Sequence, residues 1–353
     1  MPSPISTTTT DRTAPLADEP PTSISPSPDS RTQRLISTEP GHGLDSARRR
    51  RRTCRPFRHA PGETGLDKRD RWPNRARLAL SVVVNVEEGS EQSIAEGDKG
   101  PEPVDELGVV LKRPIRNYAN ESNYKYGLLA GAPRVMRLLA EHGIRATFTA
   151  AALSLERAPD LTRQIVAGGH ETCSHGWRWV HQFHMDEAAE REFIAKAVAS
   201  ITRTTGERPV GWLSRYLLTP NTRRLLVEAG FTYHMDDFSD DLPFWDRAAG
   251  RPILILPYAL DSNDMKMWTS PSLTPEDWLK YALDTFDWLY REGAEDPKMM
   301  SFGLHLRIIG RPGRIGAFER FLLHVRKHPD VWIATRREIA QRWASLHPPE
   351  ATA

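Results

Sequence analysis

Acidic and imidazole side chains follow several short apolar runs of this 353-residue chain. The run Leu78–Val86 ends in the acid pair Glu87–Glu88, and later runs end next to His175 and in His305. Adjacent carboxylates are costly to hold together unless they bind something or share a proton. Imidazole titrates near neutral pH and suits proton transfer. We therefore select Glu87, His175 and His305 as catalytic candidates, the alternatives being a solvated turn and structural histidines.

Polar side chains also follow the other apolar runs. Each alone could be a capped turn or a surface ion pair. In a barrel enzyme, however, the chemistry lies at the carboxyl ends of the strands, so these residues should share one mouth. The expected substrate-binding residues are Glu88, Glu121, Trp179, Arg215, Asp237, Asn263, Asp264 and Arg311.

The elements that must position these residues alternate along the chain. Short runs rich in β-branched residues are typical of buried strands, and longer segments with a 3.6-residue period are typical of helices. Strands are expected at Leu78–Val86, Ala146–Ala151, Val210–Leu213, Thr232–Met235, Ile253–Tyr258, Met299–His305 and Val331–Ala334, with a further one ending at Ser174. Helices are expected at Gly127–His142, Pro159–Ala167, Asp186–Thr204, Pro275–Arg291 and Ala317–Lys327. About seven strands alternating with helices predict an α/β fold, a distorted (β/α)7-type, TIM-like barrel.

Composition divides the chain into three parts. Residues 1–70 are rich in Ser, Thr, Pro and Arg, cannot bury enough apolar area to fold, and predict a disordered leader. Residues 71–348 form the expected barrel domain, and 349–353 a short tail. The run Arg48–Arg52 could touch an acidic surface or serve as an address, or it could be a solvated segment.

Charge and cysteine content limit the functional classes. The net charge of +2 does not predict nucleic-acid binding. No run of 18 apolar residues occurs, so no membrane partner is expected. The two cysteines, Cys54 and Cys173, do not suggest a disulfide framework and fit a reducing compartment, so we expect a cytoplasmic protein.

Several segments carry a family resemblance. They include NVEEGSE at 85–91, GGHETCSHGWRW at 168–179, PYALDSNDM at 257–265 and GLHLRIIGRPGR at 303–314. Over about residues 70–348 the sequence resembles the polysaccharide-deacetylase superfamily, and within it the branch of metal-independent, urate-catabolism-type allantoinases. The resemblance implies a hydrolase of carbon–nitrogen bonds other than peptide bonds, a small-molecule substrate and a homotetramer.

The resemblance also bears on metal. Metal-dependent members of the superfamily use an Asp-Asp pair and a His-x-x-x-His pair. Here the acids are Glu87 and Glu88, the first His matches His175, and Trp179 stands at the second His position. A catalytic zinc needs three protein ligands and an open fourth position, whereas Glu88 and His175 supply two. We expect no cofactor; the alternative is a divalent ion such as Zn²⁺ held by Glu88 and His175.

Three hypotheses follow. In the first, Glu87 is the general base on water, His305 protonates the leaving nitrogen, and Arg215, His175 or backbone N–H groups stabilise the oxyanion of a small, cyclic amide (allantoin, hydantoin or imide-like). The second is a metal-dependent de-N-acetylase of chitin-like or peptidoglycan sugars. The third is a binding protein on a barrel that has lost its activity. The stretch LSRYLLT at 213–219 and Trp268 depart from the allantoinase pattern, so the substrate could differ.

Overall fold

The computed structural model describes residues 67–109, 111, 113–247, 250–269 and 271–349. The predicted leader lies outside the described residues except for 67–70, where a 3-10 turn forms over Lys68–Asp70. The strands are β1 Leu78–Val86, β2 Thr147–Ala150, β3 Glu171–Ser174, β4 Gly211–Trp212, β5 Tyr233–His234, β6 Phe244–Asp246, β7 Ile253–Ile255, β8 Lys298–His305 and β9 Val331–Ile333. All are parallel to their neighbours except β6, which pairs antiparallel with β7.

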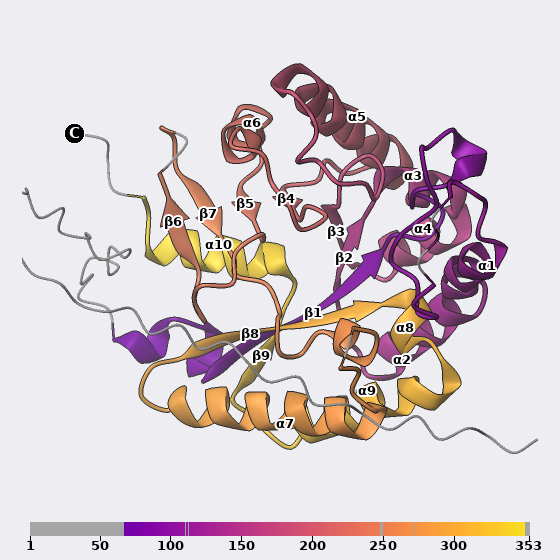
Figure 1. Ribbon diagram of the computed structural model, residues 1–353. Coiled ribbons are helices and arrows are strands. Elements are labelled where there is room, and N and C mark those ends of the chain that lie inside the picture. Colours follow the sequence, from indigo (N-terminus) through magenta and orange to yellow (C-terminus); the bar gives the residue numbers. More distant parts are fainter. Residues whose placement is uncertain (1–66, 110, 112, 248–249, 270, 350–353) are drawn as a thin grey trace, which may run out of the picture. The chain divides into compact units, whose positions relative to one another are not determined.

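The sheet curls into the predicted barrel. Its strand order is β6-β7-β5-β4-β3-β2-β1-β8, with β9 also paired to β1. Figure 1 shows β1 crossing the middle of the domain between β8 and β2. Beyond the end strand β8, the segment that follows β7 forms one isolated parallel bridge, in which Asn263 pairs with Gly303 of β8. Gly303 permits this approach because a Cβ there would lie 2.9 Å from Nδ2 of Asn263. The predicted distorted α/β barrel is confirmed.

Most helices cover the outside of the sheet, whereas the last helix packs against the inner core through Ile339, Ala340 and Trp343. The helices are α1 Tyr118–Tyr126, α2 Ala132–Glu141, α3 Ala152–Arg157, α4 Pro159–Ala167, α5 Glu187–Thr205, α6 Thr222–Glu228, α7 Pro275–Glu292, α8 Leu306–Ile309, α9 Pro312–Val325 and α10 Arg336–Leu346. In the view of Figure 1, α7 and α9 lie below the sheet, and α5 and α6 lie above it. A π-helical turn, Gly127–Gly131, joins α1 to α2. The helical segment predicted from Gly127 therefore starts nine residues earlier, at Tyr118.

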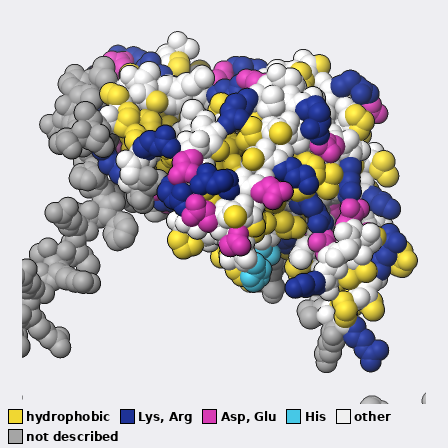
Figure 2. Space-filling model, turned by 90° about the horizontal axis from the view of Figure 1, so that it is seen from above, with side chains coloured by type: hydrophobic (Ala, Val, Ile, Leu, Met, Phe, Trp, Pro, Cys, Tyr) yellow, Lys and Arg dark blue, Asp and Glu magenta, His cyan; other side chains and the backbone are white. Residues whose placement is uncertain are grey.

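Both faces of the sheet are buried, as parallel strands require. Alternate residues of β1 point to different cores: Leu80 and Val82 pack with the outer helices, and Ala79 and Val83 pack with residues inside the barrel such as Met235. No helix in the described part of the chain is long and apolar enough to cross a membrane. Basic and acidic side chains are interspersed over the face shown in Figure 2.

Candidate active site

Strand register brings the three catalytic candidates to one mouth of the barrel. Asn85 of β1 lies opposite His305 of β8, and Ala150 of β2 lies opposite Ser174 of β3. Glu87 therefore follows the end of β1 next to the residues that follow β8, and it lies at the same end of the barrel as His175. Oε1 of Glu87 lies 3.4 Å from Nε2 of His175 and 3.3 Å from Nε2 of His305. Because all three residues are at most 5% exposed, little solvent reaches this cluster.

Hydrogen bonds fix the orientation of both imidazoles. Nδ1 of His175 donates to the carbonyl oxygen of Leu213 over 2.7 Å. Nδ1 of His305 donates to Oδ1 of Asp264 over 2.6 Å, and Oδ2 of Asp264 accepts from the His305 backbone N–H at 2.7 Å. A carbonyl and a carboxylate can only accept, so the Nδ1 atoms carry protons and each Nε2 is turned to Glu87.

Arg307, two residues beyond His305, completes the cluster. Its Nη1 lies 2.6 Å from Oε2 of Glu87 and 3.5 Å from Oε1 of Glu88. Its backbone N–H donates to the same Glu88 oxygen over 3.1 Å. The guanidinium carbon also lies 4.4 Å from the ring centre of Tyr124 and 4.9 Å from that of Trp268, within the range of cation–π attraction.

The surroundings shift the pKa values of Glu87 and Glu88 in opposite directions. Burial alone would raise the pKa of Glu87, but Arg307 and then His305 reverse this and hold its pKa well below the ordinary value. Burial raises the pKa of Glu88 above its ordinary value despite the opposing charge of Arg307. Burial would lower the pKa of His305, but Glu87 and Asp264 outweigh it and raise that pKa to about 9. The site therefore pairs an anionic Glu87 with a protonated His305 at neutral pH.

Five of the eight expected substrate-binding residues lie at or next to this cluster. Glu88 accepts from the Glu87 backbone N–H at 3.0 Å, and Asp264 holds His305. Trp179 is buried, with its ring centre 5.3 Å from the Arg307 guanidinium. Arg215 lies 3.7 Å from the same ring centre. Asn263 precedes Asp264 and forms an isolated parallel bridge with Gly303 of β8.

Two of these five, Arg215 and Asn263, bond to partners outside the catalytic cluster. Arg215 donates from Nη1 to Oε2 of Glu102 over 2.9 Å and from Nη2 to Oε1 over 2.5 Å, and Nη1 also donates to the Trp179 carbonyl. Both groups of this ion pair are buried. Oδ1 of Asn263 accepts from the backbone N–H of Met265. In the described structure these two side chains are bonded to other parts of the protein, which is a structural role.

The remaining three contact other partners. Glu121, on α1, forms an ion pair with Arg116 at 2.8 Å. Asp237 forms an ion pair with Arg223 at 3.2 Å. Arg311 donates to Oδ1 of Asn123 over 2.5 Å, and its guanidinium lies 3.6 Å from the ring centre of Tyr126.

The residues expected to form the site did not include Arg307, nor Thr149 and Tyr258 of the polar network beneath Glu87. In that network Thr149 donates to Oδ1 of Asn85 over 2.5 Å, and Nδ2 of Asn85 donates to the Tyr258 hydroxyl over 2.9 Å. One signal for Arg307 was its position at the end of β8, two residues after His305. Asn85 pairs with His305 in the strand register, so Glu87 lies at the position of β1 that matches Arg307.

The donor set around Glu87 does not fit a catalytic zinc. Three ligands of one zinc ion must each lie about 2 Å from it, so the ligand atoms must converge. Among the described residues, the one trio of His, Cys, Asp and Glu ligand atoms that lie within 4.8 Å of one another is on α7 and near α9, away from Glu87. The indole of Trp179 offers no ligand atom. The guanidinium of Arg307 supplies positive charge to both Glu87 and Glu88, where an ion would otherwise do so.

A curled parallel sheet that buries an acid, two imidazoles and a guanidinium at its carboxyl ends defines the molecule as an α/β-barrel hydrolase. Residues 124–234 match the family profile described as polysaccharide deacetylase. A protein of Schizosaccharomyces pombe described as "Putative polysaccharide deacetylase" is 35% identical over 302 residues, 79% of this chain and 94% of that protein.

Two solved structures share the fold at high identity. A probable polysaccharide deacetylase from Pseudomonas aeruginosa PAO1 is 44% identical, with a TM-score of 0.76 over 79% of this chain and 95% of that one. Puue allantoinase is 42% identical, with a TM-score of 0.77 over 84% of this chain and 100% of that one. The chain belongs to the polysaccharide deacetylase family, as its sequence predicted, and is a hydrolase of carbon–nitrogen bonds other than peptide bonds.

Proposed function

We propose that this protein hydrolyses a ring C–N bond of a small cyclic amide, of the allantoin, hydantoin or imide type, without an obligatory metal. The observation that carries the proposal is the buried contact of Glu87 with both imidazoles, at 3.4 Å and 3.3 Å, beside an Arg307 guanidinium that lies against the rings of Tyr124 and Trp268. A site this enclosed favours a small substrate over a polymer, because a polysaccharide chain needs an open groove. The high identity to an allantoinase supports the same substrate class.

The proposed reaction uses the charges that the site already holds. Glu87 accepts a proton from water as the water oxygen forms a bond to the ring carbonyl carbon. The resulting oxyanion is stabilised by the positive charge of Arg307, whose Nε and Nη2 are buried without a hydrogen-bond partner in the described structure. We assign this role to Arg307 rather than to Arg215, because Nη1 and Nη2 of Arg215 donate to Glu102 and Trp179.

His305 then completes the cleavage. Its Nε2 proton passes to the leaving nitrogen as the C–N bond breaks, giving a carboxyl group and a free amine or amide nitrogen. The proton on Glu87 returns to His305 across their 3.3 Å separation, which restores the starting state. Asp264 is the positioning residue that keeps His305 in the required orientation.

A second function is favoured by the family itself. A metal-dependent de-N-acetylase of chitin-like or peptidoglycan sugars would share this fold and these relatives. It would need an open groove and a third metal ligand in place of Trp179. A homotetramer stays a prediction of the resemblance, and a cytoplasmic location stays a prediction from the cysteine content.

The test is a substrate screen with purified, chelator-treated protein. Allantoin, hydantoin, dihydrouracil, succinimide and acetylated chito-oligomers are compared, with Glu87→Gln as the inactive control. The proposal expects ring opening of at least one cyclic amide by the wild-type protein and not by the variant. Acetate release from chito-oligomers that requires added metal would favour the second function instead.

A further inference from the structure

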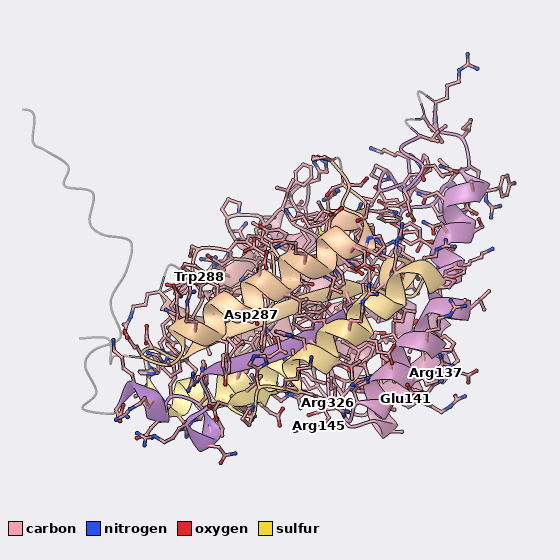
Figure 3. All side chains as sticks on the ribbon, turned by 90° about the horizontal axis from the view of Figure 1, so that it is seen from below. Arg137, Glu141, Arg145, Asp287, Trp288 and Arg326 are labelled. Carbon is pink, nitrogen blue, oxygen red and sulfur yellow. The ribbon has the colours of Figure 1, made fainter. Side chains whose placement is uncertain are left out.

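We propose a second, peripheral site that binds a borderline divalent cation such as Zn²⁺, made by Asp287, His324 and His328. Asp287 lies on α7, His324 lies in the last turn of α9, and His328 follows three residues after the end of α9. The two helices run side by side on the underside of the domain, where Figure 3 labels Asp287. The site lies outside the barrel, so the proposed reaction does not use it.

The three side chains converge at one place on the surface. Each offers one ligand atom, and the three atoms all lie within 4.8 Å of one another. Nε2 of His324 lies 2.6 Å from Oδ1 of Asp287, and the ring centres of His324 and His328 are 4.8 Å apart. Small rotations of partly exposed side chains would bring these atoms around one ion at the roughly 2 Å bond lengths that zinc requires.

A backbone contact prepares His328 for ligation. Its Nδ1 donates to the carbonyl oxygen of His324 over 3.0 Å, since a carbonyl can only accept. The proton is therefore on Nδ1, and the Nε2 lone pair is free for a metal. Hydrogen bonding of the second ring nitrogen to a carbonyl is the usual support of a metal-bound histidine.

Aromatic packing holds both rings at this place. Phe286, which is fully buried, meets the rings of His324 and His328 edge-on, with centroids 5.5 Å and 5.0 Å away. Tyr290 meets His328 in the same way at 4.7 Å. The two histidines are four residues apart in the chain and their ring centres are 4.8 Å apart, so both imidazoles can bind one ion. Two imidazoles and one carboxylate suit zinc, copper or nickel better than magnesium or calcium.

The test is calorimetric titration of the chelator-treated full chain with ZnCl2. The wild-type protein should take up one ion per chain in a saturable transition. His328→Gln and Asp287→Asn should each weaken binding by at least about tenfold, the loss that even outer-shell partners of a metal produce. Both side chains are at least partly exposed, so both variants should fold. His184→Gln, an exposed histidine outside the trio, is the matched control and should bind as the wild type does.

Two further readouts separate this site from the catalytic one. Zinc should raise the melting temperature of the wild-type protein and not that of His328→Gln, because the ion would join α7 to the end of α9. Glu87→Gln should keep full zinc affinity. No saturable uptake, or equal affinity in wild type and both ligand variants, would overturn the proposal. Zinc uptake lost in Glu87→Gln but kept in His328→Gln would overturn it and would also contradict the metal-free reaction.

Discussion

Arg307 and Glu87 form a fully buried ion pair, with Nη1 of the guanidinium 2.6 Å from Oε2 of the carboxylate. The register of β1 and β8 makes this contact, since each residue lies two positions beyond a paired strand residue, Asn85 and His305. Arg307 also reaches Glu88, so one cation serves two adjacent acids. In the proposed reaction this guanidinium supplies the positive charge that a metal would bring.

Removing that charge should harm both stability and turnover. Arg307→Met would remove one partner of a buried ion pair, which costs roughly 3–5 kcal/mol in the free energy of unfolding. Arg307→Lys keeps the charge but loses the fork geometry, so it should recover part of the stability and less of the turnover. Urea denaturation and initial rates measure the two effects. Equal rates in wild type and Arg307→Met would remove Arg307 from the mechanism.

Asp264→Asn should shift the pH dependence of kcat/KM in a protein that still folds. Glu87 and Asp264 raise the pKa of His305, so loss of the Asp264 charge should lower it. The alkaline limb of kcat/KM, which reports deprotonation of the acid His305, should then move to lower pH. Asp284→Asn, which removes an exposed carboxylate on α7, is the matched control and should leave the profile unchanged. An unshifted alkaline limb in Asp264→Asn would contradict the assignment of His305 as the acid.

The sequence predicted the parts of the molecule that depend on local pattern. The apolar run Leu78–Val86 became β1 with the predicted bounds, and Pro159–Ala167 became α4. The sequence placed Glu87, His175 and His305 at strand ends. Their meeting at one mouth then followed from the barrel fold, because the carboxyl ends of its parallel strands lie together.

Other features depend on contacts that a single sequence does not display. Helix α1 is largely polar and is held by tertiary bonds, such as those from Nδ2 of Asn120 to the carbonyls of Glu102 and Val104, so its periodicity was weak. Arg215 and Glu102 are 113 positions apart in the chain, and their pairing was not predictable from spacing. Arg307 was visible as a strand-end residue, but its direction toward Glu87 depends on the register of β1 with β8.

Stability should depend on pH through His305. Its pKa in the folded protein, about 9, lies above its ordinary value of 6.5. Its stabilising contribution, roughly 3 kcal/mol, is therefore complete below pH 6.5 and is lost as pH rises through about 9. The free energy of unfolding between pH 6 and 10 should fall less steeply in His305→Gln than in the wild type. Parallel pH dependences in the two proteins would exclude this coupling.

Gly127 should tolerate no larger residue, because it faces Glu88. A Cβ at this position would lie 2.5 Å from Oε1 and 2.8 Å from Cγ of Glu88, which is itself fully buried. Gly127→Ala should cost about 1–3 kcal/mol in the free energy of unfolding, as overpacking does, and should lower turnover by displacing Glu88. Gly313→Ala, in α9, is the control: its Cβ would meet nothing within 4 Å, and stability should be unchanged or slightly higher. Equal stability of the two variants would contradict the close packing at Gly127.

The most direct measurement is the turnover of a cyclic amide by chelator-treated protein, compared between the wild type and Glu87→Gln. The account predicts that the treated wild-type protein keeps its kcat/KM and that Glu87→Gln loses at least about 100-fold, the lower range for removal of a general base. Activity that disappears on chelation and returns only with added metal, or turnover that survives in Glu87→Gln, would contradict it.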